Sequence, residues 1–210
     1  MTPRAYGFLD WSGDSGFKFE LGSSPYLSLC IVSSADYPQL RRGLTDLREQ
    51  LGLPHHFEFH FARSSEVVRT VFFAALYSLP WDASVLIVDK RHLPRELRKM
   101  RDPAFYGFFV GHLLAGAPLR TIQVKRLLID ESEKQSALVR GIRIAISPVL
   151  RARGIQHPPK TRGEPARCWD GLQVADMLAG AAVECEGDGR DYLRGLSEER
   201  LHVQRYERPK

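Results

Sequence analysis

Residues 6–14 read YGFLDWSGD, and the rest of the chain is organised around this stretch. An apolar run ends in Asp10, and a turn made of serine, glycine and a second aspartate follows it. A buried strand that delivers a carboxylate at its end is a common start for a metal-dependent site. We therefore ask which other carboxylates folding could bring to Asp10.

The composition is that of one soluble globular domain of ordinary size. The chain has 210 residues, of which 43% are apolar and 26% charged. The formal net charge is +5 and the isoelectric point is about 9.2. This excess favours a polyanionic partner such as nucleic acid, but many basic proteins bind none.

Cysteine usage and hydropathy indicate a cytoplasmic protein outside the membrane. The three cysteines form no CxxC pair, which argues against a disulfide framework. The N-terminus has a charged Arg4 and no signal-peptide pattern. The longest apolar stretch, residues 105–119, contains His112 and is shorter than the roughly 20 residues of a membrane span. The oligomeric state stays open, a homodimer included.

The first half of the chain predicts strands followed by helices. Residues 5–10, 17–21 and 26–33 are typical of a three-stranded antiparallel meander with tight turns. Leucines at helical spacing predict a helix over 36–51 capped by Ser34, and a second helix over 66–79 begins at Ser64 or Ser65. Between them, residues 55–61 alternate apolar and polar, which predicts a strand.

The second half alternates strands and helices. Strands are predicted at 83–89 and 124–130, and helices at 103–116, 133–150 and 169–184, with a basic loop at 151–167. A charged tail, 187–210, packs on or extends from a domain formed by 1–186. This order predicts an α/β fold whose mixed sheet has the antiparallel meander first, then parallel strands, and helices on both faces.

Several acids could gather at one edge of this sheet. Asp10 and Asp130 end separate apolar strands, and Asp89 is a third candidate by the same reasoning. Asp176 lies on a helix made slim by alanines and Gly180, so that the helix can approach the sheet closely. Glu58 lies on the polar face of its predicted strand. Clustered carboxylates suit Mg²⁺ or Mn²⁺, and two such ions about 3.5–4 Å apart can clamp a phosphodiester during hydrolysis.

The sequence resembles the family called domain of unknown function 3800, a branch of the ribonuclease-H-like superfamily. The matching pieces span nearly the whole chain in the family's order: FLDWSGD (8–14), EFHF (58–61), LIDES (128–132) and GLQVADMLAG (171–180). The resemblance implies a ribonuclease-H-like, metal-dependent nuclease core with four acids as metal ligands and catalytic groups: Asp10, Glu58, Asp130 and Asp176. The chain departs from the family at Trp11, where an acid is usual, and at His60, where lysine is frequent.

Some residues have alternative readings. His56, Glu58 and His60 share one face of the predicted strand and could form a zinc hydrolase site. Asp130 could cap the helix that follows it, a role for which Ser132 competes. Four further residues have auxiliary roles. Asp14 is expected in the turn or as an outer metal ligand, and His60 as a phosphate contact or proton carrier. Lys90 is expected to support charge, and Gln173 to orient Asp176 or bind substrate.

A nucleic-acid contact is predicted for the cations of the 151–167 segment. Positive charge beside an acidic metal site offsets the repulsion of a phosphate backbone. The candidates are Arg151, Arg153, Lys160, Arg162 and Arg167. The sequence thus predicts a divalent-metal-dependent nuclease, DNA or RNA undetermined. The alternative is a domain that binds nucleic acid or protein without cleavage.

Overall fold

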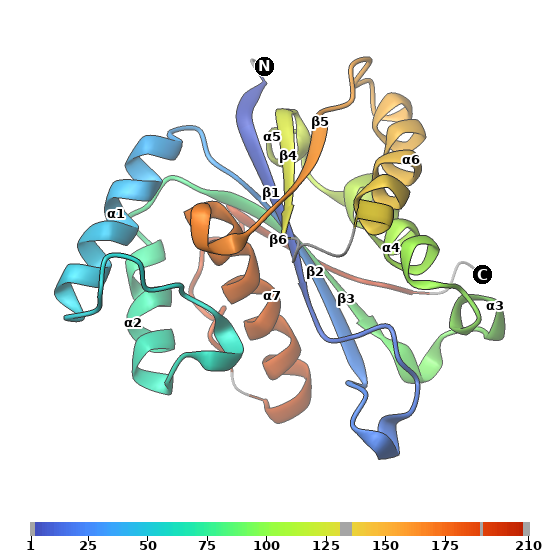
Figure 1. Ribbon diagram of the computed structural model, residues 1–210, viewed down its shortest axis with the longest axis horizontal. Helices are drawn as coiled ribbons and strands as arrows, with labels where there is room; N and C mark the ends of the chain where they lie inside the picture. Colours follow the sequence, from blue (N-terminus) through green and yellow to red (C-terminus); the bar gives the residue numbers. More distant parts are fainter. Residues whose placement is uncertain (1–2, 131–135, 190, 208–210) are drawn as a thin grey trace.

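A six-stranded mixed sheet forms the centre of the molecule (Figure 1). The computed structural model describes residues 3–130, 136–189 and 191–207. The strands are β1 (Arg4–Ser12), β2 (Tyr26–Ser33), β3 (Asp82–Asp89), β4 (Val124–Asp130), β5 (Lys160–Glu164) and β6 (Leu201–Arg205), in the spatial order β5-β4-β1-β2-β3-β6. β1, β2 and β3 pair antiparallel, whereas β4 is parallel to β1, β5 to β4, and β6 to β3.

Helices cover both faces of the sheet, as predicted. In Figure 1, α1 (Tyr37–Gln50), α2 (Glu66–Leu76) and α7 (Asp170–Asp188) lie on one side of the strands. On the other side are α3 (Arg95–Arg98), α4 (Asp102–Gly116) and α6 (Ser136–Ala152), and α5 (Leu119–Ile122) is the short helix that leads into β4. Each face buries its own apolar cluster. None of the helices in the described ranges combines the length and apolar content that a membrane crossing requires.

The helix boundaries follow local capping chemistry. α2 begins where predicted, because the Ser65 hydroxyl accepts a hydrogen bond from the N–H of Val68. The predicted cap of α1 was wrong by two residues. Asp36 caps this helix by accepting from the Gln39 N–H at 2.9 Å, while Ser34 instead accepts from the Asp36 N–H.

The third strand of the meander is not the predicted one. Residues 17–21 form no strand and contain the short 3-10 helix η1 (Phe19–Leu21). The third strand is β3, which the chain reaches only after α1 and α2. Gly13 makes the turn after β1 with φ +93°, and a Cβ there would lie 2.4 Å from the Tyr26 carbonyl oxygen.

Two further predictions are corrected in the loops. Residues 55–60 form no strand but a loop, with a turn at 55–56, that leads to the 3-10 helix η2 (Phe61–Arg63). The segment 151–167 is not only a loop, because it contains β5 and the start of η4 (Ala166–Cys168). The predicted motif residues Glu131 and Ser132, and the first residues of the predicted helix 133–150, lie outside the described residues.

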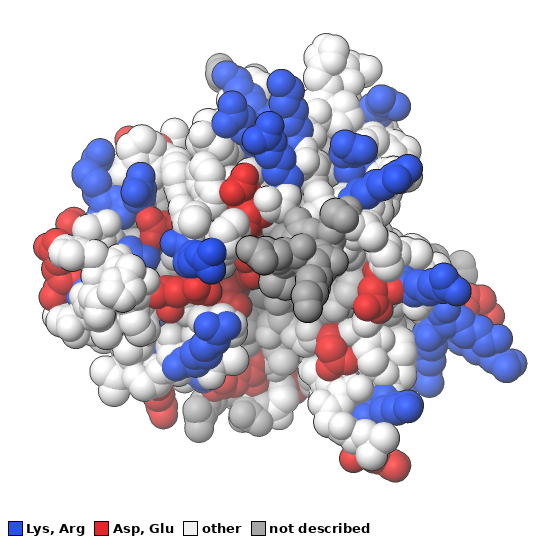
Figure 2. All heavy atoms as spheres, in the orientation of Figure 1, with Lys and Arg blue, Asp and Glu red and all other residues white. Residues whose placement is uncertain are grey.

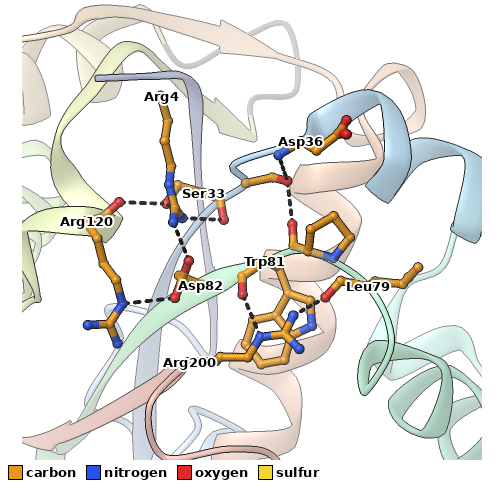
Figure 3. Close-up of polar contacts among 10 residues, drawn as sticks. Arg4, Ser33, Asp36, Leu79, Trp81, Asp82, Arg120 and Arg200 are labelled. Atoms are coloured by element: carbon orange, nitrogen blue, oxygen red, sulfur yellow. Dashed lines mark hydrogen bonds and ion pairs between the residues drawn. The ribbon is translucent and has the colours of Figure 1, made fainter. Parts of the chain in front are cut away.

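A polar cluster fastens the end of the sheet where β1 starts (Figure 3). The Arg4 guanidinium donates to the Ser33 hydroxyl at 2.9 Å and pairs with Asp82. Arg120 pairs with the other Asp82 oxygen at 3.0 Å. Arg200 donates to the backbone carbonyls that precede β3. The segment 187–210, predicted as a charged tail, therefore contributes this contact and strand β6.

Candidate metal centre

Three aspartates from distant parts of the chain line one pocket of about 380 Å³. Asp10 lies near the end of β1, Asp130 is the last residue of β4, and Asp176 is in the first half of α7. β1 and β4 are parallel with Leu9 opposite Ile129, so the next residues, Asp10 and Asp130, lie side by side on one face. The pocket is completed by backbone and side chains of Trp11, Ser12, Gly13, His60, Phe61 and Ala62.

Asp10 is the most buried of the three carboxylates. It is 6% exposed, and its Oδ1 accepts a hydrogen bond from the Trp11 N–H at 2.8 Å. Burial, followed by the charges of Asp176 and Asp130, raises the pKa of Asp10 well above its usual value. A positive charge at the pocket would lower this pKa and favour the ionised form of Asp10.

Asp176 is held by the loop that runs beside α7. Its Oδ2 accepts from the Phe61 N–H at 2.6 Å and lies 3.7 Å from His60 Nδ1. Burial raises the pKa of Asp176 and outweighs the opposing Phe61 hydrogen bond and His60 charge. Among the described residues, His60 Nδ1 is buried without a hydrogen-bond partner, since 3.7 Å is too long for one.

Glycine lets this loop lie so close to α7. A Cβ on Gly180 would lie 2.3–2.5 Å from three atoms of Phe61, and one on Gly171 would collide in the same way with the Phe8 ring of β1. The structure thus confirms that small residues let α7 pack closely against its neighbours. It allows Asp176 to reach the sheet and to meet the Phe61 amide.

Asp130 is held by the segment that follows β5. Its Oδ1 accepts from the Ala166 N–H at 2.9 Å. On β5, Glu164 is paired with Asp130 in the strand register, so a further acid lies at the same level of the sheet. Glu164 was not predicted as a site residue, because 151–167 was predicted to be a loop. Its position two residues from Arg162, in an alternating run, was the available signal.

Glu58 lies near the pocket but does not line it. It is half-buried in the loop before Phe61, and its charge contributes to raising the pKa values of Asp10 and Asp176. The structure therefore brings three of the four predicted acids together and places the fourth beside them.

A buried hydrogen-bond network positions the Glu58 loop. Gln173 Oε1 accepts from the Phe59 N–H and from the Arg48 guanidinium, both at 2.9 Å. Arg48 also donates to Asp170 at 2.6 Å and to the Phe57 carbonyl at 2.8 Å. Gln173 faces this network, not the pocket, and Asp170 is its anionic member. Arg48 was not predicted as a buried residue, because it lies among exposed charges in the α1 sequence.

The remaining auxiliary candidates act on the β1–β2 loop. The buried Lys90 ammonium donates to the Asp14 and Gly16 carbonyl oxygens, each at 2.7 Å, and lies 3.2 Å from Asp14 Oδ1. Burial raises the pKa of Asp14, but the Ser24 and Gly16 amides and Lys90 outweigh it, and the net pKa is lowered. Both residues shape the turn beside the pocket without lining it.

Asp89 is not part of the site. Opposite Tyr26 on β2, it lies four residues beyond the level of Asp10, or about 13 Å along the strand. Hydrogen bonds from Arg91 lower its pKa to about 2.

The proposed zinc ligands lie apart, and one of the five predicted cations has a structural role. The His56 side chain is exposed, while His60 turns towards Asp176, so the proposed zinc ligands do not converge. Arg153 is structural, since it donates to the carbonyls of Leu114 and Ala115 at the end of α4. The other predicted cations are exposed, namely Arg151, Lys160, Arg162 and Arg167.

The donor set fits Mg²⁺ or Mn²⁺ in kind. Carboxylate oxygens are the ligands these ions prefer, and the unpartnered His60 nitrogen faces the same acids. Within the described ranges, no three His, Cys, Asp or Glu side chains are spaced to enclose a metal ion in this conformation.

Comparison with known proteins adds the fold. No family model matches the chain, and no curated protein matches it. The chain is similar to the solved structure of the PCNA:RNase HII complex from Archaeoglobus fulgidus, with a TM-score of 0.59 and 12% identity, over 88% of this chain and 75% of that chain. Identity this low speaks for the fold and not for the activity. With the strand order above, it confirms that the chain has the predicted ribonuclease-H-like α/β fold.

Proposed function

We propose that this protein is a divalent-metal-dependent nuclease that hydrolyses phosphodiester bonds of nucleic acid. The observation that carries the proposal is the convergence of Asp10, Asp130 and Asp176, from three separate elements, on one pocket. The ribonuclease-H-like fold and the basic charge of the chain support it. Membership of the domain of unknown function 3800 family is part of the same proposal.

The chain's own residues divide the work at the pocket. Bound Mg²⁺ or Mn²⁺ would supply the positive charge and Lewis acidity that phosphodiester hydrolysis needs. Asp10, Asp130 and Asp176 would hold the ions, and Glu58 would add negative charge from the adjacent loop. His60 lines the pocket and is able to hold or release a proton at its ring nitrogens.

Cleavage assays with matched variants test this function. End-labelled RNA, DNA and RNA–DNA hybrid of one sequence are incubated with the protein and Mg²⁺ or Mn²⁺. We expect the double variant Asp10→Asn/Asp176→Asn to lose more than about 100-fold in rate, since losing a group that only supports a ligand costs about 10–100-fold. Asp46→Asn, an exposed acid on α1 outside the pocket, is the control and should cleave normally.

Two results would contradict the proposal. Full cleavage by the double variant would remove the acids from the chemistry. Binding without turnover by the wild type, across metals and substrates, would favour the non-cleaving alternative.

A further inference from the structure

The edge of the sheet at β4 and β5 carries cations in register with the acids. Lys160 is paired with Arg126, and Arg162 with Leu128, in the same parallel ladder that pairs Glu164 with Asp130. Side chains two apart along a strand share a face, so Arg126, Lys160 and Arg162 lie on the face of the sheet that carries the acids. All three cations are exposed.

The neighbouring strand β1 extends these rows. Tyr6 is opposite Arg126, and Phe8 is opposite Leu128, on the face that α7 covers. The Arg126 guanidinium lies over the Tyr6 ring, 5.8 Å from its centroid. Rows of cation and aromatic residues thus lead along the sheet to the row that contains Asp10.

These cations form no ion pair within the described part of the chain, and the Arg126 guanidinium contacts the Tyr6 ring. Among the described residues, no carboxylate lies in ion-pair range of Lys160, Arg162 or Arg126. Figure 2 shows Lys and Arg side chains gathered at the top of the molecule, over β4 and β5 and the start of β1. Unpaired positive charge concentrated on one edge attracts a polyanion.

The spacing matches a nucleic-acid backbone. Alternate residues of a strand are about 6.6–6.8 Å apart, so Arg162 lies one such step from the Asp130 level, and Lys160 and Arg126 lie two steps away. Successive phosphates of a polynucleotide strand have a comparable separation. Phosphate contacts of this kind fix the position and orientation of a strand without reading its sequence.

We propose that this edge is a track for the backbone of the strand that is cut. Arg162 binds the first phosphate beyond the scissile one, and Lys160 binds the second, with Arg126 adding positive charge beside it. The inference rests on the proposed function, and it specifies the substrate further. The substrate is a polynucleotide strand that extends at least two nucleotides past the cut on the β5 side, so dinucleotides are poor substrates.

Binding tests the track independently of cleavage. Fluorescence anisotropy measures the affinity of an end-labelled oligonucleotide at salt concentrations from about 50 to 200 mM. Each phosphate contact contributes about 0.7–0.9 to the slope of log affinity against log salt concentration, so Lys160→Gln/Arg162→Gln should reduce that slope by about 1.4–1.8. The control is Lys125→Gln, because Lys125 is exposed on β4 but lies on the opposite face, and its slope should equal the wild-type slope.

Cleavage of shortened substrates gives the second readout. Oligonucleotides are trimmed one nucleotide at a time on either side of the cut. Wild-type KM should rise when the two nucleotides on one side are removed, whereas the double variant should have a raised KM on long substrates already and be insensitive to the loss of those nucleotides.

The outcomes separate the two proposals. If the wild type binds with the expected slope difference but cleaves nothing, the track stands and the nuclease function fails. If the wild type cleaves and the double variant matches it in slope and length dependence, the track is overturned and the function stands. An equal effect of Lys125→Gln also overturns the track, and absence of binding and cleavage by the wild type overturns both.

Discussion

Replacing Gly180 with alanine should destabilise the protein and disturb the Asp176 side of the pocket. The added Cβ would lie 2.3–2.5 Å from Cβ, Cγ and Cδ1 of Phe61, which belong to the base of the ring and not to a flexible tip. Phe61 cannot easily retreat, since the Arg69 guanidinium lies 4.0 Å from its ring centroid and its N–H is bonded to Asp176.

The magnitude follows from two opposing effects. Overpacking costs about 1–3 kcal/mol, and the confined ring favours the upper value. Alanine instead of glycine inside a helix returns about 1 kcal/mol. We therefore expect a net loss of about 2 kcal/mol. At a urea m-value of about 2–3 kcal/mol/M, the unfolding midpoint falls by about 0.7–1 M.

Urea unfolding followed by circular dichroism measures this loss, and α7 provides its own control. A Cβ on Gly187 meets no atom within 4 Å, so Gly187→Ala should leave stability unchanged or raise it by up to about 1 kcal/mol. In the double variant Gly180→Ala/Phe61→Leu, the smaller side chain should relieve the clash, making the two changes less than additive. A Gly180→Ala protein as stable as the wild type would refute the close packing of Phe61 on α7.

Three further predictions concern charge. Arg48→Met should cost about 3–5 kcal/mol in urea unfolding, because it removes the buried cation 2.6 Å from Asp170 and leaves only the exposed Arg41 at 4.0 Å. Arg48→Met/Asp170→Asn should cost less than the sum of the single changes. Hydrogen bonds from Arg91 lower the pKa of Asp89 to about 2, so this carboxylate stabilises the fold above pH 3.8 and loses that effect as the pH falls towards 2. Asp89→Asn should therefore flatten the decline in unfolding free energy between pH 4 and pH 2. The raised pKa of Asp10 has the opposite effect, because the contribution of Asp10 to the free energy of unfolding is most favourable below pH 3.8 and becomes less favourable as the pH rises. Asp10→Asn should therefore raise the melting temperature at pH 7 in EDTA. Added Mn²⁺ should stabilise the wild type but not the variant.

Apolar strands and capped helices were predictable because their signals are local. The run 124–130 forms β4 with the predicted bounds, and Ser65 caps α2 as expected. The meander was predicted in kind, but its third strand was misplaced. Which strand pairs with β2 depends on contacts between residues 49 to 63 positions apart in the chain, and no short pattern encodes them.

The loop at 55–61 shows that alternating apolar and polar residues do not require a strand. Phe59 and Phe61 are buried and His56 is exposed, as a strand would require. Yet the amides of Phe59 and Phe61 donate to side chains of α7, Gln173 and Asp176, and to no neighbouring strand. Alternation therefore reports burial of every second side chain, while the partner of the backbone stays undetermined.

β5 was missed for a different reason. It is a short edge strand made of charged and small residues, KTRGE, and such composition protects a sheet edge from pairing with other molecules. The charged residues of this segment predicted a nucleic-acid contact, and the same residues made the segment resemble a loop and not a strand.

The three aspartates show why the site itself was partly predictable. Each aspartate accepts a hydrogen bond from a backbone N–H: Asp10 from Trp11, Asp176 from Phe61 and Asp130 from Ala166. The donor to Asp10 is the next residue in the chain. The donors to Asp176 and Asp130 lie in distant segments, whose positions no local sequence pattern predicts. These amides lower the cost of carboxylate charge, but burial still raises the pKa values of Asp10 and Asp176. The fold thus fixes one oxygen of each acid, while the charges of Asp176 and Asp130 still raise the pKa of Asp10. A bound cation would relieve that repulsion and release protons as it does so, and the repulsion between the acids would therefore favour cation binding.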